Sequence, residues 1–287
     1  MTIHEAQQQL LFQLYHIYDD REAQSIADWV MEHFTGWQKI DRVLNKKVIL
    51  SKPKLDELEQ ITQQLLAHKP VHYVLHQAWF QGMKLYVDEN VLIPRPETEE
   101  LVEWAVEEAP KNKQIKILDV GTGSGCIPIA LKKKLPEAEI FGCDISDGAL
   151  QVAFRNAQEQ NTPINLLQVD FLSQEERNAL PVFDIIVSNP PYISVNEKSE
   201  IDKHVVEYEP HTALFVPDDD SLVFYEHLAE FGRTHLAENG FMMMEIHYLK
   251  GDAVKNLFES KGYVVEVRKD MQGKDRFVGC WMLDVRG

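Results

Sequence analysis

The residues with the clearest chemical meaning are Asn189-Pro190-Pro191-Tyr192, which follow the apolar run 183–188 and so stand at the end of a predicted buried strand. Chemistry on a planar conjugated NH2 group, such as methyl transfer, requires that both N–H hydrogens be held while the nitrogen lone pair faces the electrophile. The side-chain carbonyl of Asn189 and the backbone carbonyl of Pro190 are two acceptors suited to this task. Pro191 favours an extended Pro190, and Tyr192 offers a ring face. An ordinary turn is the alternative interpretation.

A second group of residues lies at the ends of three other predicted strands. The first strand leads into Gly121-Thr122-Gly123-Ser124-Gly125, whose glycines permit a tight turn and a close approach of backbone to ligand. Asp144 ends the next strand, where a carboxylate can accept from both hydroxyls of a ribose. Asp170 and Phe171 end the third, with an acceptor for an adenine amine and a ring for its base. Each residue alone could be a cap or core residue, but together they indicate a nucleoside site.

Strands and helices alternate around these residues from about residue 101, which is typical of an α/β fold with a mostly parallel sheet covered on both faces. The predicted strands are 115–120, 139–143, 164–169, 183–188, 241–246, 263–268 and 276–283, and the clearest helices are 149–160, 222–236 and 253–261. Only a short turn around Gln272-Gly273-Lys274 separates the last two strands, so they should pair antiparallel.

The first 70 or so residues are predicted to form short amphipathic helices with breaks at Asp19-Asp20 and Lys52-Pro53. Apolar residues recur there at three- and four-residue steps: Ala23, Ile26, Ala27, Val30, Met31 and Phe34, then Leu55, Leu58, Ile61, Leu65 and Leu66. Residues 77–93 alternate like strands, with likely turns at Gly82 and 88–90, and predict a hairpin. The expected domains are therefore a helical domain (1–76), a hairpin linker (77–93) and an α/β domain (94–287).

The composition is that of an ordinary soluble globular protein, with 44% hydrophobic and 26% charged residues. No apolar stretch approaches membrane-spanning length, and the N-terminus lacks the layout of a signal peptide. Three scattered cysteines fit neither a disulfide framework nor a metal spacing. We therefore expect a cytoplasmic protein with no membrane partner and no metal site.

The formal charge of −17 argues against a large nucleic-acid footprint, which needs a basic face. The first part of the chain nevertheless contains a local basic cluster, formed by Lys39, Arg42, Lys46, Lys47, Lys52 and Lys54. Such a cluster is most often a solvated face, and a partner-binding patch is the alternative.

The glycine loop and the strand-end acids together resemble the class I methyltransferases that use S-adenosylmethionine. The resemblance runs from about residue 94 to the end. It implies a Rossmann-like, seven-stranded sheet with one antiparallel strand, and S-adenosylmethionine as cofactor. Cys126 stands where the dinucleotide fingerprint has Gly or Ala, which makes NAD the poorer ligand.

The Asn-Pro-Pro-Tyr motif is shared by enzymes that methylate adenine N6 and by those that methylate glutamine amides. A second segment, Ile93-Pro94-Arg95-Pro96-Glu97-Thr98-Glu99 with its flanks in 91–103, looks like the signature of the release-factor glutamine methyltransferases, the PrmC (HemK) family. Further matches at 70–75, 79–82, 209–214 and 269–279 extend the likeness over nearly the whole chain. The departures are His76 and His247 in place of glycine, Lys250 in place of glutamine, and Val216-Pro217-Asp218-Asp219-Asp220 in place of a glycine-rich turn.

The resemblance implies methyl transfer from S-adenosylmethionine to the glutamine of the Gly-Gly-Gln motif in peptide chain release factors, gripped by the helical N-terminal domain. The cofactor residues would be Gly121, Thr122, Gly123, Ser124, Gly125, Asp144, Asp170, Phe171 and Asn189. The substrate residues would be Arg95, Asn189, Pro190, Pro191 and Tyr192, with Asn189, Pro190 and Tyr192 catalytic. Tyr192 would pack against the amide plane while nitrogen attacks in line, without a strong general base.

Two other functions are considered, and each can be distinguished from glutamine methylation by a feature of the sequence. An N6-adenine methyltransferase needs a basic target-recognition region, which the acidic charge disfavours, and we expect no stable nucleic-acid partner. A non-catalytic S-adenosylmethionine sensor or scaffold would have no use for an intact Asn-Pro-Pro-Tyr.

Overall fold

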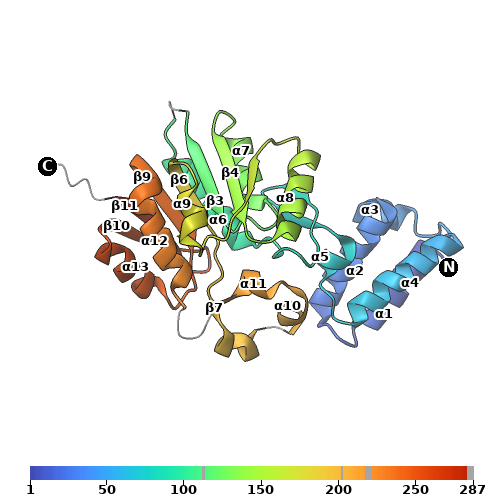
Figure 1. Ribbon diagram of the computed structural model, residues 1–287. Helices are drawn as coiled ribbons and strands as arrows, with labels where there is room; N and C mark the ends of the chain where they lie inside the picture. Colours follow the sequence, from blue (N-terminus) through green and yellow to red (C-terminus); the bar gives the residue numbers. More distant parts are fainter. Residues whose placement is uncertain (112–113, 202, 217–220, 283–287) are drawn as a thin grey trace. The chain divides into compact units, whose positions relative to one another are not determined.

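The computed structural model describes residues 1–111, 114–201, 203–216 and 221–282. They form two compact units, shown in Figure 1. The first unit comprises Met1–Gln77 together with Lys203–Tyr208. The second comprises the described residues of Ala78–Asp202 and Glu209–Gly287.

The first unit is helical, as the sequence predicts. Its helices are α1 (Ile3–Leu14), α2 (Asp20–Thr35), α3 (Lys39–Leu44), α4 (Lys52–Leu66), α5 (Val71–Leu75) and α10 (Lys203–Tyr208). All six apolar positions predicted in α2 are buried, and so are Leu58, Ile61 and Leu65 of α4. The α2 helix begins after Asp19, whose carboxylate accepts from two backbone N–H groups, and ends at Gly36 in the left-handed conformation.

One member of the basic cluster does not lie on a solvated face. Arg42 is only 3% exposed, and it donates to Asp28 Oδ1 (2.8 Å) and to the Trp37 carbonyl (3.0 Å). Lys39 donates to the other oxygen of Asp28. The prediction of a solvated face is therefore wrong for Arg42, because a buried guanidinium is stable only when it is paired. Lys46, Lys47, Lys52 and Lys54 are exposed.

The second unit is built on a seven-stranded sheet in the order β10-β11-β9-β6-β3-β4-β5. The strands are β3 (Lys116–Val120), β4 (Glu139–Asp144), β5 (Asn165–Gln168), β6 (Phe183–Ser188), β9 (Leu236–Glu245), β10 (Tyr263–Lys269) and β11 (Asp275–Met282). Within the described sheet, β11 alone runs opposite to the other six strands, which confirms the predicted fold class. The β9 strand begins earlier than residue 241 because Leu236 already pairs with Phe183 across a register shift. Residue 283 of the last predicted strand lies outside the described residues.

Helices cover both faces of this sheet (Figure 1). The α6 (Pro96–Glu108), α7 (Cys126–Lys134) and α8 (Asp147–Glu159) helices share one core cluster with the sheet, and α12 (Val223–His235) and α13 (Gly251–Ser260) share the other. Neighbouring residues in a strand face opposite clusters: Ile117 and Ile185 face the first, Leu118 and Ile186 the second. Burial on both faces explains why the central strands are almost continuously apolar.

The predicted hairpin is confirmed for 78–85 only, where β1 (Ala78–Phe80) pairs with β2 (Met83–Leu85) across Gln81 and Gly82, both at positive φ. The prediction is wrong for 86–93, which form no strand. The alternation reflects burial instead, since Val87, Val91 and Ile93 are buried and the residues between them are more exposed. At Tyr86 the Asn156 amide accepts from the backbone N–H (2.7 Å) and donates to the carbonyl (2.9 Å), as a neighbouring strand would.

Short elements complete the second unit. They are β7 (Ile193–Ser194) paired with β8 (Phe215–Val216), the 3-10 helix η1 (Val195–Glu200), and the helices α9 (Gln174–Asn178) and α11 (His211–Leu214). Of the replaced glycine-rich turn, residues 217–220 lie outside the described residues. Among the helices of the described part, none has the length and apolar character needed to cross a membrane.

Candidate active site

A cavity of about 350 Å³ lies at the carboxyl ends of β3, β4, β5 and β6 in the second unit. Parallel strands end at the same edge of a sheet, so the residues that follow them converge there. Of the residues predicted for the site, those lining the cavity are Arg95, Gly121, Thr122, Ser124, Asp144, Asp170, Phe171, Asn189, Pro190 and Pro191. Gly123, Gly125 and Tyr192 do not line it.

The glycine loop turns sharply after β3. Gly121, Gly123 and Gly125 all have φ between +50° and +78°, where other residues are strained. The N–H groups of Gly121 and Thr122 both donate to the Cys143 carbonyl at the end of β4 (2.9 Å each). A Cβ atom at Gly125 would meet the Cβ of Ala153 at 3.1 Å, so this glycine also allows α7 and α8 to approach closely. Gly121, Thr122 and Ser124 of this loop line the cavity.

Asp144 is fixed by the backbone of two loops. Its Oδ2 accepts from the Gly123 N–H (2.9 Å) and its Oδ1 accepts from the Ser146 N–H (3.0 Å). Burial raises the pKa of this carboxyl, and the N–H donors oppose that rise. A half-buried carboxylate held in this way retains lone pairs for the hydroxyls of a ribose.

The acid–aromatic pair lies just after β5, and both of its residues line the cavity. Asp170 Oδ1 accepts from the Leu172 N–H (3.0 Å), which closes a local turn. Phe171 is only 5% exposed, and its ring packs edge-on against Phe231 at 5.2 Å.

Asn189 and Pro190 follow β6 and line the same cavity. The Asn189 Nδ2 group donates to Thr98 Oγ1 at 3.2 Å. Among the described residues, neither Asn189 Oδ1 nor the Pro190 carbonyl accepts a hydrogen bond. Both oxygens are thus uncommitted, as an amide-holding site requires.

Tyr192 does not line the cavity, and its hydroxyl donates to Glu245 Oε1 at 3.1 Å. Burial and the nearby Glu245 charge raise the pKa of this phenol. Arg95 lines the cavity and forms an ion pair with Glu209 (2.6 Å), whose other oxygen accepts from the Ile93 N–H. The Glu209 side chain is 1% exposed, so this pair fixes the wall on which Arg95 lies.

Thr98 and Glu245 were not predicted as site residues. Thr98 Oγ1 donates to Glu245 Oε2 at 2.7 Å and accepts from Asn189. One signal could have found Glu245, because it is an acid at the end of a parallel strand, as Asp144 is. Across the described residues, no group of three or more His, Cys, Asp or Glu could hold a metal ion.

The parallel sheet with its single antiparallel strand, and the glycine loop at the carboxyl end of β3, define a class I methyltransferase. Residues 102–210 match the family described as Methyltransferase small domain, and residues 5–75 match the PrmC N-terminal domain. Among solved structures, the hMettl16 catalytic domain in complex with the MAT2A 3'UTR hairpin 6 is similar in fold, with a TM-score of 0.57. It is 15% identical and the match covers 84% of this chain and 87% of that one.

The curated relatives are much closer. The release factor glutamine methyltransferase of Flavobacterium psychrophilum is 42% identical over 282 residues, covering 97% of this chain and 98% of the relative. That of Bacteroides thetaiotaomicron is 40% identical over 263 residues, covering 91% and 94%. This chain belongs to the release factor glutamine methyltransferase family. The family that the sequence motifs indicate is confirmed, and S-adenosylmethionine is the methyl donor that its fold class implies.

Proposed function

We propose that this protein transfers a methyl group from S-adenosylmethionine to the side-chain amide nitrogen, N5, of the glutamine in the Gly-Gly-Gln motif of peptide chain release factors. The observation that carries the proposal is the pair of uncommitted oxygens, Asn189 Oδ1 and the Pro190 carbonyl, on the wall of the cavity. The near full-length similarity to release factor glutamine methyltransferases supports the choice of substrate.

The amide nitrogen of glutamine is a poor nucleophile, because its lone pair is delocalised into the carbonyl. Two acceptors that each take one N–H hold the NH2 group and fix the direction of its lone pair. Asn189 and Pro190 would supply these acceptors on a segment that directly follows a central strand, so the sheet sets where the segment begins. When bound, S-adenosylmethionine supplies an electrophilic methyl group.

The residues at the other strand ends fit the adenosine part of this donor. Asp144 would accept from the ribose hydroxyls, and the loop 121–125 would lie against the rest of the molecule with its backbone. Asp170 and Phe171 would bound the base. Asn189 would contribute to this site as well as to the substrate, since it lies on the same cavity wall.

On the substrate side, Arg95 and Pro191 would form part of the wall that the glutamine passes, and Tyr192 would act from behind Asn189 rather than against the amide plane. The helical domain, residues 1–76, would grip the release factor, and 77–93 would link it to the methyltransferase domain, 94–287. Since release factors act in translation, we infer a cytoplasmic location. We infer further that binding does not depend on a stable complex with nucleic acid.

The test is incubation with purified release factor and methyl-labelled S-adenosylmethionine, followed by mass mapping of the modified residue. Label on the Gly-Gly-Gln glutamine is expected, and a release factor with Ala at that position should take up none. Label on a naked oligonucleotide in place of the release factor would contradict the proposal.

The Asn189→Ala variant is the sharpest prediction of this mechanism. It removes one of the two acceptors, so turnover should fall by about a thousandfold or more, as when a group that acts in the transition state is lost. Affinity for S-adenosylhomocysteine, measured by calorimetry, should change by less than about threefold, because the Asp144 contacts remain. Near-normal turnover in this variant would refute the assigned role.

A further inference from the structure

A buried carboxylate lies directly behind Asn189 and Tyr192. Glu245, at the end of β9, is 2% exposed. It accepts hydrogen bonds from two hydroxyl groups on different segments: Thr98 Oγ1 of α6 at 2.7 Å and the Tyr192 hydroxyl at 3.1 Å. Both of its oxygens are therefore engaged.

These contacts have a fixed direction. A carboxylate can only accept, so the one hydroxyl hydrogen of Thr98 is directed to Glu245. Thr98 Oγ1 is then left with lone pairs only, and it can serve Asn189 only as an acceptor. The group that it faces at 3.2 Å must be the Nδ2 amide of Asn189. The carbonyl oxygen of Asn189 is thereby excluded from Thr98 and is left for the cavity.

We propose that Glu245 and Thr98 are positioning residues that select the amide orientation of Asn189. An asparagine side chain has nearly the same shape when its oxygen and nitrogen are exchanged. In the wrong orientation it would present two donors to the substrate NH2 group, which also donates, and the glutamine could not be held. The relay from Glu245 through Thr98 removes this alternative. The inference deepens the proposed function and rests on it.

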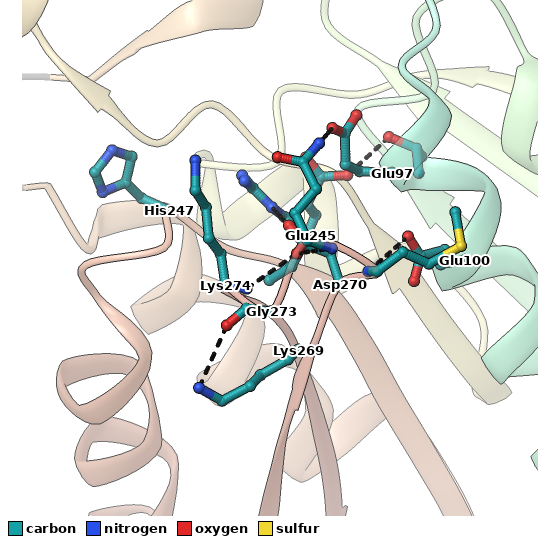
Figure 2. Close-up of polar contacts among 12 residues, drawn as sticks. Glu97, Glu100, Glu245, His247, Lys269, Asp270, Gly273 and Lys274 are labelled. Carbon is teal, nitrogen blue, oxygen red and sulfur yellow. Dashed lines mark hydrogen bonds and ion pairs between the residues drawn. The ribbon is translucent and has the colours of Figure 1, made fainter.

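The surroundings of Glu245 keep its contacts in place. Burial raises the pKa of Glu245, whereas the Thr98 hydroxyl, the Arg276 charge and the Tyr192 hydroxyl lower it. Arg276 donates from Nε to Asp270 Oδ2 (3.2 Å), and Asp270 Oδ1 accepts from the N–H groups of Gln272 and Lys274. Figure 2 shows this turn between Lys269 and Lys274 with Glu245. The cation that lowers the pKa of Glu245 is thus itself anchored.

The turn is also attached to α6, the helix that carries Thr98. The Met271 N–H donates to Glu100 Oε1, and Gln272 Nε2 donates to Glu97 Oε1 (Figure 2). The end of β9, the turn after β10 and the first half of α6 are therefore joined by polar contacts. Because the relay is built on three joined elements, it can restrict the Asn189 side chain to a narrower range of orientations than a single loop could.

Two variants of Thr98 test the relay in the methyl-transfer assay. Thr98→Val keeps the shape but loses both hydrogen bonds, so kcat should fall by about ten- to a hundredfold, the usual effect of a misplaced reacting group. KM for the release factor and affinity for S-adenosylhomocysteine should stay within about twofold. Thr98→Ser restores the hydroxyl, and its kcat should return to within about threefold of the wild type. Equal loss in Thr98→Ser and Thr98→Val would overturn the inference.

Tyr225→Phe is a matched control. The Tyr225 hydroxyl donates to the backbone carbonyl of Glu245 at 3.0 Å, so this variant also deletes one buried hydrogen bond to the same residue. It should lower the melting temperature but leave kcat within about twofold, because the carboxylate is untouched. If Tyr225→Phe reduces kcat as much as Thr98→Val does, the loss reflects a general loss of packing around Glu245, and the positioning role of Thr98 and Glu245 is wrong.

A second readout separates failure of the relay from failure of the proposed function. The Asn189 side-chain amide resonance, assigned from its loss in Asn189→Asp, should shift in both Thr98→Val and Glu245→Gln, and its protons should exchange faster. Glu245→Gln belongs in this test because glutamine has one acceptor oxygen where two hydroxyls need two. An unchanged resonance overturns the inference whatever the wild-type activity. A wild type that fails to methylate release factor, yet shows the shift, overturns only the proposed function.

Discussion

Neutralising Asp119 should stabilise the second unit at neutral pH. Asp119 lies in the middle of the sheet and is 0% exposed, and neither of its carboxylate oxygens has a hydrogen-bond partner among the described residues. Burial therefore raises its pKa from 3.8 to about 7; the Thr122 side chain opposes this rise, and the charge of Asp144 adds to it.

The size of the effect follows from proton linkage. Because the pKa is higher in the folded state, folded protein binds the proton more tightly than unfolded protein does, so stability is lost as pH rises from about 3.8 to about 7. A shift of roughly three units corresponds to about 4 kcal/mol above this window. Asp119→Asn has no charge to bury, so its stability advantage over the wild type should grow by about 2.5 kcal/mol between about pH 5 and about pH 8.

Native-state hydrogen exchange is the appropriate assay, since the slowest amides of β3 and β4 report the unfolding of this unit alone. Both proteins are compared at the two pH values without ligand. Asp252→Asn is the control, because Asp252 is exposed in the first turn of α13 and its neutralisation removes a charge from the same unit. An advantage for Asp119→Asn that is the same at both pH values would refute the reasoning.

The remaining predictions concern the cofactor cavity. Gly125→Ala should lower the free energy of unfolding by about 2 kcal/mol and Gly123→Ala by about 1 kcal/mol, measured by urea denaturation, because both force alanine to positive φ. Only the Gly125 variant also meets Ala153, and equal losses would contradict this view of the loop. Asp144→Asn should weaken S-adenosylhomocysteine binding by about tenfold in calorimetry, since a charged acceptor is lost. Undiminished affinity would exclude the ribose contact.

The parts of the fold that the sequence predicts correctly are those set by local periodicity. The α2 positions at three- and four-residue steps are all buried, and the central strands alternate between two core clusters. The error at 86–93 has a tertiary cause: an alternating pattern records burial, and Val87, Val91 and Ile93 are buried although they belong to no strand. His76 is one of the departures from the family pattern, which usually has glycine there. It ends α5 in the left-handed conformation (φ 50°), which glycine adopts without strain.

In the candidate site, too, some features can be predicted from the order of elements and others depend on tertiary packing. Asp144 and Asn189 could be placed at the sheet edge because Asp144 is the last residue of β4 and Asn189 directly follows β6. The contact between Thr98 and Glu245 spans 147 residues, and no periodicity links the two. The ring of Tyr192 predicts packing against an amide plane, whereas the partner of its hydroxyl, Glu245, is supplied by tertiary packing, and this pairing has no signal in the sequence.

The position of the site follows from the spatial order of the strands in the sheet. From β3 the chain proceeds outward through β4 and β5, and then returns to place β6 and β9 on the other side of β3. Connections that leave in opposite directions open a crevice above the point where the order reverses. The last paired residues of the two strands there, Val120 and Ser188, are also joined by a hydrogen bond from Ser188 Oγ to the Val120 carbonyl at 2.8 Å. Since Gly121 and Asn189 come next, the sheet itself determines the separation between the glycine loop and the residues proposed to hold the amide. A substitution in the surrounding loops should therefore change affinity before it changes this alignment.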